Sequence, residues 1–269
     1  MIKLFNVSKK YCKRLWALRD VSFEVPQGAS LLLRGDSGAG KTTLLRMIYG
    51  LEEPDEGHIM VAGRNIFRLR RSSLPFLRRQ IGFAFQDLKL MEHRSIIENV
   101  AYPLYLRGVW GKTAKRRAVK ACALVGLEAG LQRRCGVLAR GEQQQVVLAR
   151  AVVAEPALLL ADEPTAHLDA TLTASVLNLL TRINSRGTTV VLATGDRLVA
   201  EGFQASQVVQ LKGGALVGAQ SSNQNLSAKN PKAASEDNDP ADHELAAQTS
   251  NPRQPQDGRR SEPQRSVMD

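Results

Sequence analysis

The sequence predicts an α/β fold with a largely parallel sheet, because short apolar segments alternate with helical patterns along the chain. Apolar runs at residues 31–33, 158–160 and 188–192 are typical of strands buried on both faces. Helical patterns follow the first run and precede the second, at about residues 41–49 and 141–154. The chain of 269 residues is 43% apolar, which is enough to bury a core and excludes a wholly disordered protein.

The remaining elements are predicted in chain order from the same patterns. Residues 2–5 and 21–25 alternate apolar and polar side chains, as half-buried strands do. Further strands are expected at residues 59–61 and around 82–85, and residues 95–138 are expected to be helical. Thr113 is predicted to cap a helix in this stretch. The buried face of that helix is predicted to consist of Ala114, Ala118, Ala121, Cys122 and Val125.

Composition excludes several classes of protein. No apolar run approaches the roughly 18 residues that a membrane span needs, and the first residues have no apolar stretch typical of a signal peptide. The three cysteines, Cys12, Cys122 and Cys135, are widely spaced, so we expect reduced thiols. A polytopic transporter, a secreted disulfide scaffold and a zinc finger are therefore not expected.

The positive charge lies in the first 218 residues. The net charge is +11, whereas residues 219–269 contain more acidic than basic side chains. This last segment is rich in Ser, Asn, Gln and Pro, and we expect it to be a disordered tail. Basic clusters at residues 9–14, 68–79 and 112–120 are consistent with solvated faces, an anionic membrane surface or nucleic acid. Composition alone does not separate these alternatives.

A phosphate-binding loop follows the first buried strand. The residues from Gly35 to Thr43 match the pattern G-x-x-x-x-G-K-[ST], directly after a predicted strand and before a predicted helix. Glycines let the backbone amides approach phosphates, Lys41 can bridge the terminal phosphates, and Thr42 can hold Mg²⁺. The predicted nucleotide-binding residues here are Gly35, Asp36, Ser37, Gly38, Ala39, Gly40, Lys41, Thr42 and Thr43.

Two adjacent carboxylates end the second buried strand. Asp162 and Glu163 follow the apolar run at 158–160, separated from it only by Ala161. Beside a phosphate loop, Asp162 is predicted to hold the Mg²⁺ shell, and Glu163 is predicted to be the catalytic base that polarises the attacking water.

These motifs together resemble an ATP-binding subunit of the ABC-transporter family. The segments that carry the resemblance are, in chain order, the phosphate loop, Phe85-Gln-Asp87, Gly141-Glu-Gln-Gln144, Asp162-Glu-Pro-Thr165 and Leu168-Asp169. Within this superfamily the chain is most similar to the FtsE family of cell-division ATP-binding proteins, through residues 17–23, 39–45 and 75–82. The resemblance covers about residues 1–218, which predicts an ABC-type ATP-binding domain followed by the tail.

The resemblance implies a fold, cofactors and partners. The expected fold is a P-loop NTPase with a RecA-like core and mainly parallel sheet, an antiparallel β subdomain, and a helical subdomain at about residues 90–138. ATP and Mg²⁺ are expected, with Tyr11 stacking on adenine and Gln86 joining Thr42 and Asp162 around the metal. The expected assembly is a head-to-tail homodimer on an integral membrane protein resembling FtsX, which controls cell-wall hydrolases. The location is then peripheral, on the cytoplasmic face of the inner membrane, and no nucleic acid is expected.

Three residues depart from the family pattern. Ala139 and Arg140 stand where the signature segment normally reads Ser-Gly, and Gly195 stands where the family has a histidine near the γ-phosphate. The resemblance implies that Ala139 lacks a hydroxyl that would contact the γ-phosphate and that Gly195 lacks a second such contact. Arg140 places a long cation where a glycine normally lets the backbone approach. Together these changes predict weakened turnover. The alternatives are a nonhydrolysing ATP-dependent scaffold of the same complex and the ATPase of a lipoprotein or macrolide exporter.

Overall fold

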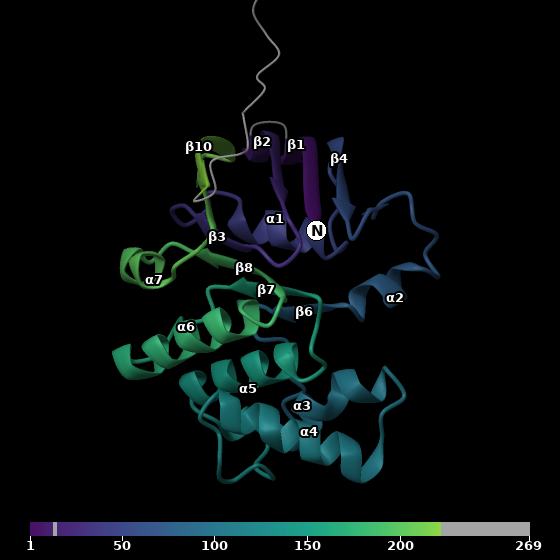
Figure 1. The fold of residues 1–269 in the computed structure, drawn as a ribbon, viewed down its shortest axis with the longest axis vertical. Helices are drawn as coiled ribbons and strands as arrows, with labels where there is room; N and C mark the ends of the chain where they lie inside the picture. The colour runs from purple at the N-terminus through teal and green to yellow at the C-terminus, as the bar shows by residue number, and fades with distance from the viewer. Residues whose placement is uncertain (13–14, 222–269) are drawn as a thin grey trace, which may run out of the picture. The chain divides into compact units, whose positions relative to one another are not determined.

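The computed structural model describes residues 1–12 and 15–221 (Figure 1). Its strands are β1 (Ile2–Cys12), β2 (Leu15–Val25), β3 (Ser30–Arg34), β4 (Glu56–Val61), β5 (Arg64–Asn65), β6 (Ile81–Ala84), β7 (Leu158–Asp162), β8 (Thr189–Thr194), β9 (Gln207–Lys212) and β10 (Ala215–Ser221). Its helices are α1 (Lys41–Ile48), α2 (Leu74–Arg78), α3 (Ile96–Tyr105), α4 (Gly111–Leu124), α5 (Arg140–Val152), α6 (Ala170–Asn184) and α7 (Arg197–Gly202), with a 3₁₀ turn η1 (Cys135–Val137).

The central sheet has six strands in the order β10-β9-β3-β8-β7-β6. All neighbouring pairs are parallel except β10 with β9. The buried strands β3, β7 and β8 contain the apolar runs seen in the sequence, and every residue of β7 and β8 is buried. The prediction of a mainly parallel α/β sheet is confirmed.

A second sheet is antiparallel, with the order β2-β1-β4-β5. Strand β1 pairs with β2 from Ile2 opposite Val25, and with β4 from Ile2 opposite Val61. Alternate residues of these strands are buried against α1 and the parallel sheet, in one core that contains Ile2, Leu33 and Leu44. The expected antiparallel subdomain is therefore present.

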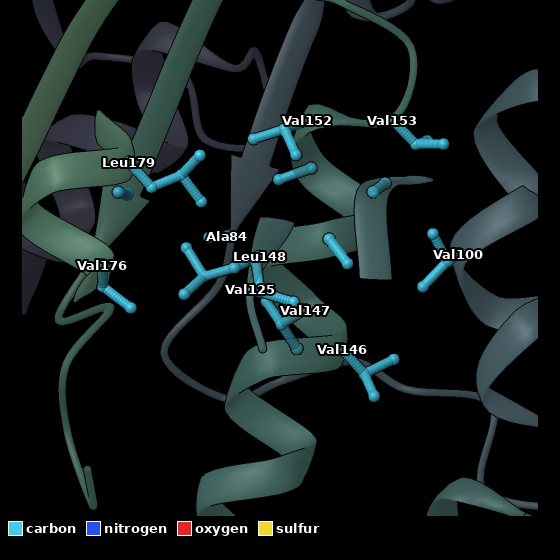
Figure 2. Close-up of a cluster of buried hydrophobic side chains, with 14 of the residues drawn as sticks. Ala84, Val100, Val125, Val146, Val147, Leu148, Val152, Val153, Val176 and Leu179 are labelled. Atoms are coloured by element: carbon cyan, nitrogen blue, oxygen red, sulfur yellow. The ribbon is translucent and has the colours of Figure 1, made fainter. Parts of the chain in front are cut away.

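The opposite face of the parallel sheet is covered by α5 and α6, and α3 and α4 pack beyond α5 (Figure 1). Figure 2 shows this second core around Val147 and Leu148 of α5, with Ala84 of β6 and Val100 of α3 nearby. Both α5 residues have no exposed surface. Cys122 and Cys135 are buried free thiols in this core, and burial raises the pKa of each to about 11.

The helical stretch predicted for residues 95–138 is interrupted. Helices α3 and α4 are separated by a turn at Gly108, and an irregular segment follows Gly126; both glycines have a positive φ. Thr113 does not cap α4, which begins earlier, at Gly111, with Trp110 at the N-cap position. The predicted buried face is correct, because Ala114, Ala118, Ala121, Cys122 and Val125 are all buried.

The last described strand, β10, continues to Ser221, beyond the boundary expected at residue 218. The rest of the predicted tail lies outside the described residues. Among the described helices, none combines the length and apolar character needed to cross a membrane.

Candidate functional site

Four parallel strands end at the same edge of the central sheet, and the predicted site residues follow them. The phosphate loop follows β3, and Gln86 follows β6. Asp162 ends β7 and Glu163 comes directly after it, whereas Gly195 follows β8. Strand register aligns these ends, because Arg34 is opposite Thr194 and Asp162 is opposite Ala193. The carboxyl edge of a parallel sheet is where α/β proteins bind ligands.

The phosphate loop closes on the N-terminus of α1. Gly40 is the N-cap residue, with φ at 99°. A Cβ atom on Gly40 would lie 2.2 Å from the Ala17 carbonyl oxygen. Glycine is required there by backbone conformation and by space, and the loop brings unpaired amides of the first helical turn toward the cavity.

Lys41 is held across the loop rather than in solvent. Its ammonium donates to the carbonyl oxygens of Gly35 at 2.7 Å and Asp36 at 3.1 Å. It also lies 3.5 Å from Glu163 Oε1, and the residue is only 6% exposed. The cation is therefore fixed at the floor of the cavity, where a terminal phosphate would contact it.

Glu163 is oriented by two residues of the neighbouring strand β8 and by Gly195, which follows that strand. Its main-chain N–H donates to the Ala193 carbonyl at 2.9 Å, which continues the β7–β8 pairing. Its carboxylate accepts from Thr194 Oγ1 at 3.0 Å and from the Gly195 N–H at 2.8 Å. The residue has a positive φ of 46°, an uncommon conformation for a non-glycine residue that is often retained at functional sites.

A small cavity of about 110 Å³ fits a hard divalent cation. Thr42, Gln86 and Asp162 line it, together with Arg46, Phe85 and Asp87. Thr42 Oγ1 lies 3.5 Å from Gln86 Oε1, and Asp162 is 1% exposed with its Oδ1 atom lacking a hydrogen-bond partner in the structure. Burial raises the pKa of Asp162 to about 6, and the charge of Glu163 adds to this effect. A buried, unpaired carboxylate oxygen beside two neutral oxygens matches the preference of Mg²⁺.

A larger cavity of about 570 Å³ contains most of the predicted nucleotide-binding residues. It is lined by Tyr11, by loop residues 37–43, by Gln86 and by Glu163. Gly35 and Asp36 do not line it, and they contribute the two carbonyls that hold Lys41. Tyr11 is 53% exposed, and its hydroxyl pairs with Thr43 Oγ1 at 3.0 Å and donates to Glu52.

Sequence reasoning missed Trp16, which also lines this cavity. The β1–β2 register places Trp16 opposite Lys10, whose ammonium lies 3.8 Å from the centre of the indole ring. The sequence feature that could have indicated this residue is its type, because the chain contains only two tryptophans. A half-buried aromatic ring beside Tyr11 gives the cavity a second surface on which a base can stack.

Gly195 closes the cavity where β8 ends. A Cβ atom there would lie 3.2 Å from the Gly35 carbonyl oxygen, 3.5 Å from Lys41 Nζ and 3.6 Å from Glu163 Oε1. A side chain at position 195 would therefore project among the groups that surround the terminal phosphate.

The signature segment lies at the start of α5, away from this cavity's lining. Ala139 is the N-cap residue and has no side-chain acceptor, so only Glu142 contributes a cap, by accepting from the Ala139 N–H at 3.1 Å. Arg140 is exposed, and its guanidinium donates to Gln143 at 3.3 Å. Neither Ala139 nor Arg140 lines the large cavity formed by the described residues.

A separate groove of about 420 Å³ runs between the sheet edge and the helical subdomain. Its lining combines apolar side chains, including Phe83, Tyr102 and Leu106, with five cations and no carboxylate among the described residues. The cations are Arg78, Arg79, Lys89, Arg107 and Arg150. Three of these arginines donate to main-chain carbonyls: Arg78 to Tyr49 and Gly50, Arg107 to Ala154 and Arg79, and Arg150 to Leu88 and Lys89.

Comparison with known proteins identifies relatives of the whole domain. The sequence pattern described as "ABC transporter" matches residues 18–166. The cell division ATP-binding protein FtsE of Escherichia coli K12 is 45% identical over 196 residues, which are 73% of this chain and 88% of that protein. FtsE of Streptococcus pneumoniae D39 is 37% identical over 217 residues, 81% of this chain and 94% of that protein.

Solved structures give the same result. A dimeric structure of MJ0796, a bacterial ABC transporter cassette, matches with a TM-score of 0.78 at 32% identity, over 82% of this chain and 98% of that one. A second dimeric structure of the same cassette, in a post-hydrolysis state bound to ADP and Pi, matches with a TM-score of 0.77.

Proposed function

This chain belongs to the ABC transporter family of ATP-binding proteins and is an FtsE-like ATPase, and we propose that it couples ATP binding and hydrolysis to an integral membrane protein resembling FtsX. The partner regulates cell-wall hydrolysis during division, and the ATPase is bound peripherally at the cytoplasmic face of the inner membrane. The observation that carries this proposal is the convergence of Lys41, Asp162 and Glu163 at one edge of the sheet, in a chain 45% identical to FtsE.

Each group of residues in the site has one role in the reaction. The amides of loop residues 37–43 and the ammonium of Lys41 bind the β- and γ-phosphates of ATP. Glu163 accepts a proton from the attacking water, and Thr194 and the Gly195 N–H hold its carboxylate in place. Tyr11 and Trp16 contact the base.

Thr42, Gln86 and Asp162 are the residues that would hold Mg²⁺. When bound, the ion neutralises charge that develops on the phosphate oxygens. Asp162 must be deprotonated for this role, so its raised pKa makes metal binding weaker below about pH 6.

Ala139, Arg140 and Gly195 weaken turnover without removing ATP binding. Loss of one preorganised donor to a developing charge typically costs about 2.7–4 kcal/mol, or roughly 10²–10³ in rate. The effects of two such losses on the rate of one site are not simply additive. Lys41 and Glu163 are retained, so a slow ATPase is the function that the site supports best. A nonhydrolysing ATP-dependent scaffold is the second candidate, and the same three residues favour it.

The groove described above is the surface for the membrane partner. Three of its four arginines, Arg78, Arg107 and Arg150, donate to main-chain carbonyls, and none of the four forms an ion pair with a carboxylate among the described residues. Phe76, Tyr102 and Leu106 are 61%, 45% and 50% exposed at or beside this groove. The complementary partner segment is therefore one that combines apolar side chains with carboxylates.

The test combines binding with a single turnover. Calorimetry with the full chain is expected to show Mg²⁺-dependent ATP binding that Lys41→Ala abolishes or severely weakens. Phosphate release in one turnover is expected to be slow and to disappear in Glu163→Gln, while ATP binding remains. Tight binding with no phosphate release would establish the scaffold, and absence of ATP binding would overturn both.

A pull-down tests the partner. Solubilised membranes are incubated with the tagged chain with and without ATP, and the captured membrane protein is identified. The double variant Arg78→Glu/Arg79→Glu is expected to lose that protein while still binding ATP. Capture that is insensitive to this charge reversal would contradict the role of the groove.

A further inference from the structure

We propose that the exposed face of α4 binds the anionic phospholipid headgroups of a membrane surface directly, independently of any protein partner. This cationic face consists of Lys112, Lys115, Arg116, Arg117 and Lys120. The proposal rests on the proposed function in one respect: that function places the protein at a membrane.

The charges of α4 are concentrated and unpaired. All five cations are exposed, and the fourteen residues of α4 contain no Asp or Glu. None of the five forms an ion pair within residues 1–12 and 15–221. At about 100° per residue, Lys112, Arg116 and Lys120 lie opposite the buried stripe of Ala114, Ala118, Ala121 and Cys122, whereas Lys115 and Arg117 flank that stripe on either side.

The positive charge continues from α4 to the groove. Arg107 donates to the main-chain carbonyl of Arg79. Burial lowers the pKa of Arg107, the charges of Arg117 and Arg79 lower it further, and the charge of Glu155 raises it. Arg107 and Arg79 both line the groove. The cationic face of α4 therefore lies near the groove through Arg107 and Arg117.

Exposed apolar side chains accompany these cations. Trp110, immediately before α4, is 65% exposed, and its ring stacks on Tyr105 with centroids 4.8 Å apart. Val119 and Leu124 of α4 are 42% and 44% exposed. Tryptophan, aliphatic side chains and lysines on one surface are typical of the lipid–water interface, where apolar groups reach the acyl boundary while cations contact headgroup phosphates. A nucleic-acid backbone offers these aliphatic side chains no apolar layer, so the surface favours a membrane.

The test uses the full chain and vesicles that contain no protein. Flotation is compared for phosphatidylcholine vesicles and for vesicles with about one third phosphatidylglycerol, at low and high salt. We expect binding only to the anionic vesicles, with a strong decrease at high salt. The variant K112Q/K115Q/R116Q/K120Q is expected to lose at least about tenfold in vesicle affinity, because each cation near such a surface contributes to binding.

A matched control removes the same charge elsewhere. R64Q/R182Q/R186Q/K212Q replaces four exposed cations outside the helical subdomain, none of which forms an ion pair among the described residues. It is expected to keep vesicle affinity within about twofold of the parent. Circular dichroism and ATP binding verify that both variants are folded.

Two results would overturn the proposal. One is equal loss of vesicle binding in both variants, which would show a nonspecific effect of net charge. The other is a parent chain that binds a DNA duplex but not anionic vesicles. Either result, with ATP binding and turnover intact, would leave the proposed ATPase function standing.

Discussion

Gly195 is the position where the family resemblance predicts a histidine. A Cβ atom on Gly195 would lie 3.2 Å from the Gly35 carbonyl oxygen, which is a tight contact. The backbone of Gly195 does not have a positive φ, so its conformation does not require glycine. A histidine there requires a shift of a few tenths of an ångström and places its imidazole near Lys41 and Glu163. The missing side chain can therefore be restored without rebuilding the loop.

The first prediction is that Gly195→His combined with A139S/R140G raises kcat for ATP by at least about tenfold, because it restores donors to the developing charge. Steady-state phosphate release measures the change. Gly218→His is the control, because Gly218 lies in β10 with no atom within 4 Å of a built Cβ, and it should leave kcat unchanged. An unchanged rate in the repaired chain would show that these three residues do not limit turnover.

The second prediction concerns Asp162 and the way in which the free energy of unfolding depends on pH. Its folded pKa of about 6 lies above the ordinary value of 3.8 for an aspartate, with burial as the main cause. Between these two values the folded state binds more protons than the unfolded state, so this carboxyl makes stability decrease as pH rises. The resulting decrease in the free energy of unfolding is complete above about pH 6 and is on the order of 2–3 kcal/mol.

Asp162→Asn removes this decrease. Urea unfolding without Mg²⁺ is expected to show the variant gaining stability relative to the parent between pH 4.5 and pH 7, while its Mg²⁺-dependent ATP binding is weakened. A stability difference that does not change over this pH range would show that Asp162 titrates normally.

Asn99 of α3 holds the segment between β6 and α3 in place. It is completely buried, its amide donates to the carbonyls of Met91 and Ser95 at 3.0 Å, and its Oδ1 accepts from the Met91 N–H at 2.9 Å. We predict that Asn99→Ala lowers the free energy of unfolding by about 2–4 kcal/mol, because several buried polar groups lose their partners. Urea unfolding measures the change, and Gln132→Ala, at an exposed amide, should stay within about 0.5 kcal/mol. Equal effects of the two substitutions would contradict the role of Asn99.

Some elements of the fold could be predicted from sequence patterns, and others could not. The runs of β3, β7 and β8 are apolar on both faces, so the parallel core and the loop after β3 could be predicted from local composition. The groove could not, because α2, α3, α5 and β6 come together there only through packing of distant segments. Trp16 was missed for the same kind of reason, since it approaches the loop through the long β1–β2 pairing.

In the proposed head-to-tail dimer, the whole chain supplies only part of each active site. The loop, Glu163 and Gly195 lie around one cavity, whereas Ala139 and Arg140 do not line it within the described residues. The signature segment of one chain then faces the phosphate loop of its partner. It follows that a homodimer carries both departures in every site, whereas a mixed dimer can separate them.

Mixing two partly repaired chains tests this assembly directly. One chain carries Gly195→His and the other carries A139S/R140G, and each alone retains one departure in both sites. In a head-to-tail mixed dimer, one site combines His at position 195 from the first chain with the repaired signature of the second, so that site is fully repaired. The other site has both departures. We therefore predict that a 1:1 mixture hydrolyses ATP faster than the mean of the two separate chains, because one repaired site outweighs the loss of the other. A mixture whose rate equals that mean over a range of concentrations would mean that signature and loop do not meet across a dimer.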